Sequence, residues 1–167
     1  MICIDPGLRG IGMAIFSENE LHRAEYVKNP HNGRGYAAHS ALAHQIHIYQ
    51  AYRNLFSEAL IELPQVYPGM PKTDLNDLID VAGVGAACAY VLAEYYGFVK
   101  SVFPREWKGS VDKQVMLKRI WSKLTPGEQA VVQKTNKSDT EDILDAIGIG
   151  LWRLNRLNTK NYPGATP

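Results

Sequence analysis

Residues 2–16 of the chain read ICIDPGLRGIGMAIF, which is two apolar runs separated by a tight turn. The first run, Ile2–Ile4, leads into Asp5-Pro6-Gly7, and the second run, Gly10–Phe16, follows closely. Pro and Gly between two apolar runs are typical of a hairpin turn. This stretch therefore predicts two antiparallel strands, with the acidic residue Asp5 at the end of the first one.

Downstream of the hairpin, apolar patterns predict three further strands and four helices. A loop rich in Gly, Asn and His is expected over 28–40. The form Ser138-x-x-Glu141 is a capping box, so the last helix should begin near Asp139. Strands that first meander and then alternate with helices predict an α/β fold of three layers with a mixed sheet. The expected strands are 21–27, 59–62 and 99–103, and the expected helices are 41–57, 75–96, 110–124 and 139–157.

Length and composition are those of an ordinary globular domain. The chain has 167 residues and 18.6 kDa, with 46% apolar and 21% charged residues, and domains typically run to ~100–200 residues. No apolar run approaches the ~20 residues of a membrane span, and no secretory signal is recognisable at the N-terminus. We therefore expect a single domain over 1–157, a flexible tail over 158–167, no membrane partner and a cytoplasmic location. Two cysteines, Cys3 and Cys88, are too few for a disulfide framework or a four-thiolate zinc site and are expected to be reduced core residues.

Charge is distributed unevenly along the chain. Residues 1–97 carry 6 basic and 10 acidic residues, a net charge of −4, whereas residues 98–167 carry 12 and 7, a net charge of +5. A basic half can indicate a polyanionic partner. In DNA binding, basic side chains supply the salt-dependent contacts to phosphates. The basic residues on or beside the helix expected over 110–124 are Arg105, Lys108, Lys113, Lys118, Arg119 and Lys123.

Four carboxylates from separated segments could form one site. Asp5 and Glu62 each end an apolar strand, and ligands of α/β sheets collect at the carboxyl ends of strands. Asp142 and Asp145 lie three residues apart on the last helix, so they share a face that also carries apolar residues. Like charges in such surroundings are unfavourable unless a cation or a proton lies between them. The helix macrodipole favours acids in a first turn, but it does not explain Asp145, which lies further in.

These residue types suit a hard cation. Mg²⁺ prefers oxygen ligands and takes only a few carboxylates per ion. Two such ions, about 3.5–4 Å apart, can clamp the attacking water and the leaving oxygen of a phosphodiester. No Cys and His cluster offers a competing zinc site, because His39, His44 and His47 are interpreted as surface residues.

Several stretches together resemble a known family. The strand IDPGLRGIGMAIF, the Glu in ALIELPQVY, the stretch VFPREWKG and the closing EDILDAIGIGLW resemble the RuvC-type Holliday junction resolvases, most of all the small phage-encoded members. These enzymes belong to the ribonuclease H-like nucleases. The resemblance implies a ribonuclease H-like three-layer fold with a mixed five-stranded sheet flanked by helices. It also implies a homodimer that resolves four-way DNA junctions by paired symmetric nicks and leaves 5′-phosphate and 3′-hydroxyl ends.

The resemblance further implies roles for individual residues. Its catalytic acids and metal ligands fall on Asp5, Glu62, Asp142 and Asp145, which would hold two Mg²⁺ ions, or Mn²⁺ in their place. Bacterial members insert an aromatic residue into the junction, and Tyr67 is the candidate here, although two prolines alter this loop and the spacing from the strand-end Glu is longer. The remaining residues expected to bind nucleic acid are Lys108, Lys113, Lys118 and Arg105.

Two features of the sequence allow more than one interpretation. Trp107 is better interpreted as a core residue than as one that stacks on a base. The small residues GVGAA at 83–87 could admit a DNA backbone, form the dimer contact, or let the helix pack tightly on the sheet.

Other functions share parts of this pattern. A nuclease of the same fold could act on RNA–DNA hybrids or on branched DNA in general, because the acids contact phosphates rather than bases. Asp5-Pro6-Gly7 also has the Asp-x-Gly form of a phosphate loop in sugar-kinase and actin-like ATPases, but those folds need two such domains. A non-catalytic DNA-binding relative would not need all four acids. We therefore expect a metal-dependent junction resolvase without a nucleotide cofactor, in the cytoplasm of a prokaryotic cell and encoded by that cell or by a phage.

Overall fold

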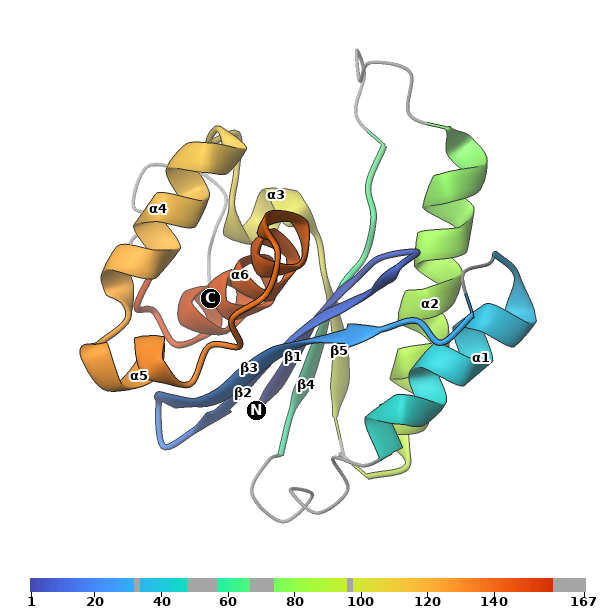
Figure 1. The fold of residues 1–167 in the computed structure, drawn as a ribbon, viewed down its shortest axis with the longest axis horizontal. Coiled ribbons are helices and arrows are strands. Elements are labelled where there is room, and N and C mark those ends of the chain that lie inside the picture. The colour runs from blue at the N-terminus through green and yellow to red at the C-terminus, as the bar shows by residue number, and fades with distance from the viewer. Residues whose placement is uncertain (32–33, 48–56, 67–73, 96–97, 158–167) are drawn as a thin grey trace.

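The computed structural model describes residues 1–31, 34–47, 57–66, 74–95 and 98–157, which form a five-stranded sheet with helices on both faces (Figure 1). This is the three-layer α/β architecture predicted from the sequence. The strands are β1 (Ile2–Pro6), β2 (Gly10–Ser17), β3 (Glu20–Lys28), β4 (Ala59–Glu62) and β5 (Val99–Val102). The helices are α1 (Tyr36–Gln45), α2 (Leu75–Ala93), α3 (Pro104–Trp107), α4 (Lys113–Lys123), α5 (Pro126–Ala130) and α6 (Lys137–Arg153).

The sheet is mixed, with the strand order β3-β2-β1-β4-β5. The first three strands form an antiparallel meander, whereas β4 runs parallel to β1 and β5 runs parallel to β4. Ile4 pairs with Ile61, so the residues that follow them, Asp5 and Glu62, reach the same edge of the sheet together. Both strand ends therefore stand where ligands of α/β sheets usually bind.

The alternation of side chains along the strands divides the core in two. Ile4 and Ile61 pack in the cluster under α1 and α2, whereas Cys3 and Leu60 pack in the cluster under α4 and α6. Successive residues of a strand point to opposite faces. The alternation therefore directs Asp5 and Glu62 to the face that α6 covers.

Helix α6 crosses β2 in backbone contact at Gly12. A Cβ atom at this position would lie only 2.0 Å from the carbonyl oxygen of Asp142 and 2.3 Å from its carbonyl carbon. Gly12 is also the ladder partner of Asp5 in the β1–β2 pair. A residue without a side chain lets two backbones approach this closely. The same contact therefore brings the acidic turn of α6 next to the end of β1.

Two helices begin before their predicted first residues, and α4 begins after its own, at Lys113 instead of residue 110. Helix α1 begins at Tyr36, inside the predicted loop. Its N-cap is Gly35 at φ +86°, which has no side chain to cap the helix. The sequence therefore lacks the usual signal for a helix start, and the prediction placed the start too late. The remainder of that predicted helix, 48–56, lies outside the described residues. Helix α6 is capped by Asn136, whose side chain accepts from the Asp139 N–H at 3.1 Å, so it begins before the predicted capping box and ends at Arg153.

Two short helices were not predicted. Both begin with Pro in the first turn, at Pro104 in α3 and Pro126 in α5. In α5, the side chains of Thr125 and Glu128 form a capping box, which is a start signal that the periodicity argument did not use. The short helices add to the predicted order without changing the sheet.

Helix α2 is long and apolar, and its two glycines, Gly83 and Gly85, face inward. Its 19 residues reach a mean hydropathy of 1.4, so by length and composition alone α2 could cross a membrane. The expectation that no apolar segment approaches the length of a membrane span is therefore wrong for α2. A Cβ at Gly83 would lie 2.6 Å from the His39 ring, and one at Gly85 would contact Pro6 and Ile61. Tight packing thus accounts for these two glycines.

Both cysteines are buried and free, as predicted. The expectation of surface histidines is wrong for His39, which is buried and lies 3.2 Å from Asp80 across the α1–α2 contact.

The close approach at Gly12 can be tested by adding one methyl group. We expect Gly12→Ala to lower the free energy of unfolding by about 2 kcal/mol or more, because overpacking costs ~1–3 kcal/mol and the obstructing atoms belong to helix backbone. Chemical denaturation measures the change. Gly127→Ala is the matched control, because its Cβ would meet only Thr125 Oγ1 at 3.9 Å. Equal stability of the two variants would contradict the backbone contact.

Candidate active site

Four acidic side chains from three elements meet at the edge where β1 and β4 end. Asp5 comes from β1, Glu62 is the last residue of β4, and Asp142 and Asp145 come from α6. Glu62 and Asp145 are only 8% and 6% exposed, and Asp142 is half-buried. The structure thus brings together the four carboxylates that the sequence singled out.

The cluster is electrostatically strained. Burial, followed by the charges of Glu62, Asp145 and Asp142, raises the pKa of Asp5 well above its ordinary value. Burial is also the main cause that raises the pKa of Glu62 and of Asp145. The pKa of Asp142 rises to about 6, mainly through burial, although Lys113 opposes the shift. The nearby lysines therefore compensate the four carboxyl groups only in part, and a bound cation would provide further positive charge.

Lys108 lies inside the acidic cluster. Its Nζ is 3.5 Å from Glu62 Oε1 and 3.6 Å from Asp145 Oδ2. Burial alone would lower the pKa of Lys108, but the charges of Asp145, Glu62 and Asp5 outweigh it and raise the pKa above the ordinary value. The ammonium group is therefore charged and partly neutralises the acids. Sequence reasoning expected Lys108 to contact DNA phosphates and did not foresee these two contacts.

Trp107 holds Glu62 in place. Its indole Nε1–H donates a hydrogen bond to Glu62 Oε2 at 2.6 Å, and the side chain has no exposed surface. The ring packs against α6 at Gly148, where a Cβ would lie 2.4 Å from it. The interpretation of Trp107 as a core residue is therefore confirmed, but its hydrogen bond was missed. Pairing the predicted strands that contain Glu62 and Val102 could have indicated this hydrogen bond. Val102 lies beside Glu62 in the parallel β4–β5 pair, and α3, which carries Trp107, begins two residues later.

Of the other basic candidates, only Lys113 interacts with the acids of α6. Lys113 begins α4 and forms an ion pair with Glu141 at 3.0 Å. Burial lowers the pKa of Lys113, but Glu141, Asp145 and Asp142 reverse this and leave it raised. Arg105 is exposed on α3, and Lys118 is exposed on α4. Tyr67 lies outside the described residues.

The site fits a divalent cation in donor type and charge. Within the described ranges, no group of three Asp, Glu, His or Cys side chains converges tightly enough to be the ligands of one ion; Lys108 stands between Glu62 and Asp145. Carboxylate oxygens are nevertheless the ligands that Mg²⁺ prefers. A doubly charged cation would also relieve the repulsion that raises the pKa of these groups.

Removing one of these charges should stabilise the metal-free protein. A carboxyl group whose pKa is raised on folding binds more protons in the folded state, so stability falls as pH rises from about 4 toward the raised value. We expect Asp5→Asn to melt at a higher temperature than wild type at pH 7 in EDTA, with a gap that narrows toward pH 4. Glu94→Gln, at the exposed end of α2, should leave the melting temperature unchanged. A lower melting temperature for Asp5→Asn at pH 7 would contradict this account of the strain.

Comparisons with known proteins place the fold. No protein-family model matches the sequence, and no curated protein does either. The structure of T. thermophilus RuvC in complex with a Holliday junction substrate matches with a TM-score of 0.65 and 18% identity over 95% of this chain and 97% of that one. A second Thermus thermophilus RuvC structure matches with a TM-score of 0.58 and 16% identity over 93% and 98% of the two chains. The yeast mitochondrial Holliday junction resolvase matches with 0.57 and 15% identity over 96% and 81%. The chain therefore has the ribonuclease H-like fold of the RuvC resolvases.

Proposed function

We propose that the chain is a metal-dependent DNA endonuclease that resolves four-way junctions. The observation that carries the proposal is the convergence of Asp5, Glu62, Asp142 and Asp145 at one edge of a RuvC-like sheet. The similarity of fold extends over nearly the full length of a RuvC that was solved with a Holliday junction substrate. Neither observation alone would specify a junction; together they favour this substrate over other phosphodiesters.

The four acids would hold Mg²⁺ or Mn²⁺, two ions in the complete site. Such ions, when bound, stabilise charge on the phosphate and make water a stronger nucleophile at neutral pH. The protein supplies the arrangement: Trp107 orients Glu62 through a 2.6 Å hydrogen bond, and the Gly12 contact positions Asp142 beside Asp5. Lys108, charged and in contact with Glu62 and Asp145, would also attract the phosphate backbone to this edge.

A homodimer would account for paired nicks. A two-fold axis presents two identical sites to a substrate that is itself nearly symmetric. Helix α2 offers a surface for this contact, because Leu75, Ile79 and Tyr90 are 62%, 69% and 73% exposed and recur at helical spacing with Ala86. Its opposite face is already packed against α1 and the sheet. The proposed dimer contact is therefore the outer face of α2, and the inward-facing Gly83 and Gly85 take no part in it.

A nuclease of the same fold with broader specificity is the alternative. The four acids recognise phosphates, so the site itself does not distinguish a four-way junction from a branched DNA or an RNA–DNA hybrid. The choice between these substrates depends on surfaces away from the acids. A panel of substrates separates them.

The central activity prediction is cleavage that depends on both metal and junction. We expect wild-type protein to cut a labelled four-way junction with paired symmetric nicks in Mg²⁺ or Mn²⁺ and not in EDTA, with little cutting of linear duplex or RNA–DNA hybrid. Asp5→Asn should lose cleavage by a factor of at least ~10³, as expected when a metal ligand is removed, and should still bind the junction.

Three outcomes of the cleavage experiment are informative. Cutting of every branched substrate or of the RNA–DNA hybrid would support metal-dependent cleavage by the four acids, but it would favour the nuclease of broader specificity over the junction resolvase. Cutting by Asp5→Asn at the wild-type rate would contradict the role of the acids. A folded wild-type protein that binds the junction but cuts nothing in either metal would contradict the proposed enzyme.

The dimer prediction concerns the outer face of α2. We expect wild-type protein to be a dimer and Ile79→Asp to be a monomer, because a charge would be buried at the contact. Light scattering after size exclusion measures the mass. Val115→Asp is the matched control, because Val115 is 50% exposed on α4 in the opposite layer and should not change the mass. A monomeric wild type, or a dimeric Ile79→Asp, would contradict this interface.

A further inference from the structure

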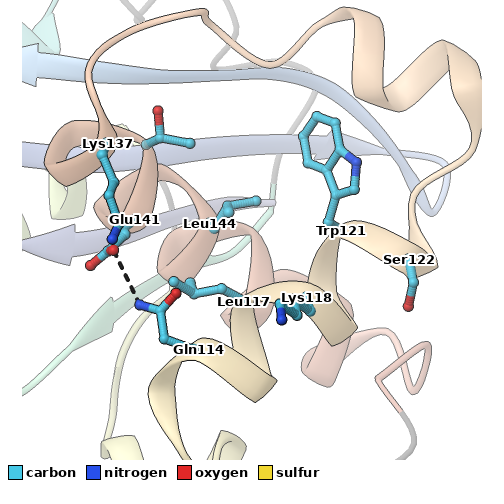
Figure 2. Close-up of a pocket in the computed structure, with 9 residues that line it drawn as sticks. Gln114, Leu117, Lys118, Trp121, Ser122, Lys137, Glu141 and Leu144 are labelled. Carbon is cyan, nitrogen blue, oxygen red and sulfur yellow. Dashed lines mark hydrogen bonds between the residues drawn. The ribbon is translucent and has the colours of Figure 1, made fainter.

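A pocket of about 390 Å³ opens between α4 and α6. This volume falls within the ~300–1,000 Å³ that is usual for small-molecule sites. Leu117, Trp121 and Leu144 supply apolar lining, and the first and last of these are nearly buried. Polar and charged side chains complete the lining: Gln114, Lys118, Ser122, Lys137, Thr140 and Glu141. Figure 2 shows how these side chains project from the two helices.

The pocket combines an exposed indole with a lining that holds two lysines and one glutamate. Trp121 is 41% exposed, so part of its indole ring is open to a ligand in the pocket. Among the described residues, neither Lys118 nor Lys137 forms an ion pair with a carboxylate. Glu141, the acid in the lining, is already paired with Lys113 and also accepts from Gln114 Nε2 at 3.3 Å. With two lysines and one glutamate, the charged side chains that line the pocket carry a net positive charge.

The pocket adjoins the candidate active site. Glu141 precedes Asp142 on α6, and its partner Lys113 also acts electrostatically on Asp142 and Asp145. Glu141 therefore lines the pocket and stands next to the acidic cluster along α6. A DNA strand with its phosphate at the acids would pass directly beside the pocket.

We propose that this pocket binds an unstacked nucleobase of the DNA strand at the active site, with the base against Trp121 and neighbouring phosphates on Lys118 and Lys137. The proposal rests on the proposed function and assigns a second contact to its substrate. A flat indole beside cationic side chains is the combination that single-stranded nucleic acids use, because every base has a π-face and every nucleotide a negative charge. Ser122, Thr140 and Gln114 add hydrogen-bonding groups at the rim.

Comparison of a DNA strand with its abasic equivalent tests the base contact separately from charge. The probes are a labelled single strand of thymidines and the same strand with abasic sites, measured by fluorescence anisotropy in EDTA so that nothing is cut. We expect wild-type protein to bind the thymidine strand about tenfold more tightly, which corresponds to ~1.4 kcal/mol and is within the ~1–3 kcal/mol of one base–aromatic stack. Trp121→Leu should reduce this preference to less than about twofold, and Trp121→Phe should retain most of it.

The lysines make a different prediction. Lys118→Gln and Lys137→Gln should weaken binding of both strands alike and lower the salt slope by about 0.7 each, as expected for single-strand phosphate contacts. Val115→Ala is the matched control, because Val115 is exposed on α4 but does not line the pocket. Thermal unfolding verifies that each variant is folded.

The outcomes distinguish this proposal from the proposed function. An unchanged base preference in folded Trp121→Leu, with wild-type protein still cutting junctions, would overturn only the base pocket and would place the base contact elsewhere on the protein. Equal binding of thymidine and abasic strands by wild-type protein would overturn it as well. Wild-type protein that binds neither strand nor the junction would overturn both proposals.

Discussion

The backbone contact between α6 and Gly12 is the constraint on which the site depends. Gly12 is the ladder partner of Asp5, and a side chain there would collide with the carbonyl group of Asp142. Gly12 thus pairs with Asp5 in the sheet and, on the same residue, lets the backbone of α6 approach the sheet closely. At the other end of the contact, Gly148 admits the Trp107 ring, which in turn orients Glu62. The four carboxylates meet because small residues let α6 pack closely on β2 and against Trp107 of α3.

This arrangement opposes the stability of the metal-free fold. Burying carboxyl groups side by side raises the pKa of Asp5, Glu62, Asp142 and Asp145, and each shift records a cost of holding the charged form. Lys108 and the Trp107 hydrogen bond offset part of that cost. Perturbed carboxyl groups in one place are typical of functional sites. The same geometry that strains the fold is therefore the geometry that would attract a divalent cation.

Much of the site was predictable because its signals are local. Asp5 and Glu62 end apolar runs, and the helical spacing of Asp142 and Asp145 sets them on one face without knowledge of the rest of the fold. The position of Lys108 could not be predicted in this way, because it depends on where the four-residue helix α3 leaves β5. The role of Gly12 could be recognised only once the docking of α6 on the sheet was known. The early start of α1 was missed because Gly35 offers no side-chain cap that would signal it. Local patterns identified the acids, whereas tertiary contacts decided what surrounds them.

The most direct measurement of the central claim is a titration of Mn²⁺ followed by paramagnetic line broadening in amide NMR spectra. If the four carboxylates form a cation site, resonances at the ends of β1 and β4 and in the second and third turns of α6 should broaden first, and Asp5→Asn should need far more Mn²⁺ for the same effect. The amides of the turn between β2 and β3, at the opposite end of the strands, should stay sharp longest (Figure 1). Broadening that is absent, or that is centred elsewhere on the protein, would contradict the account.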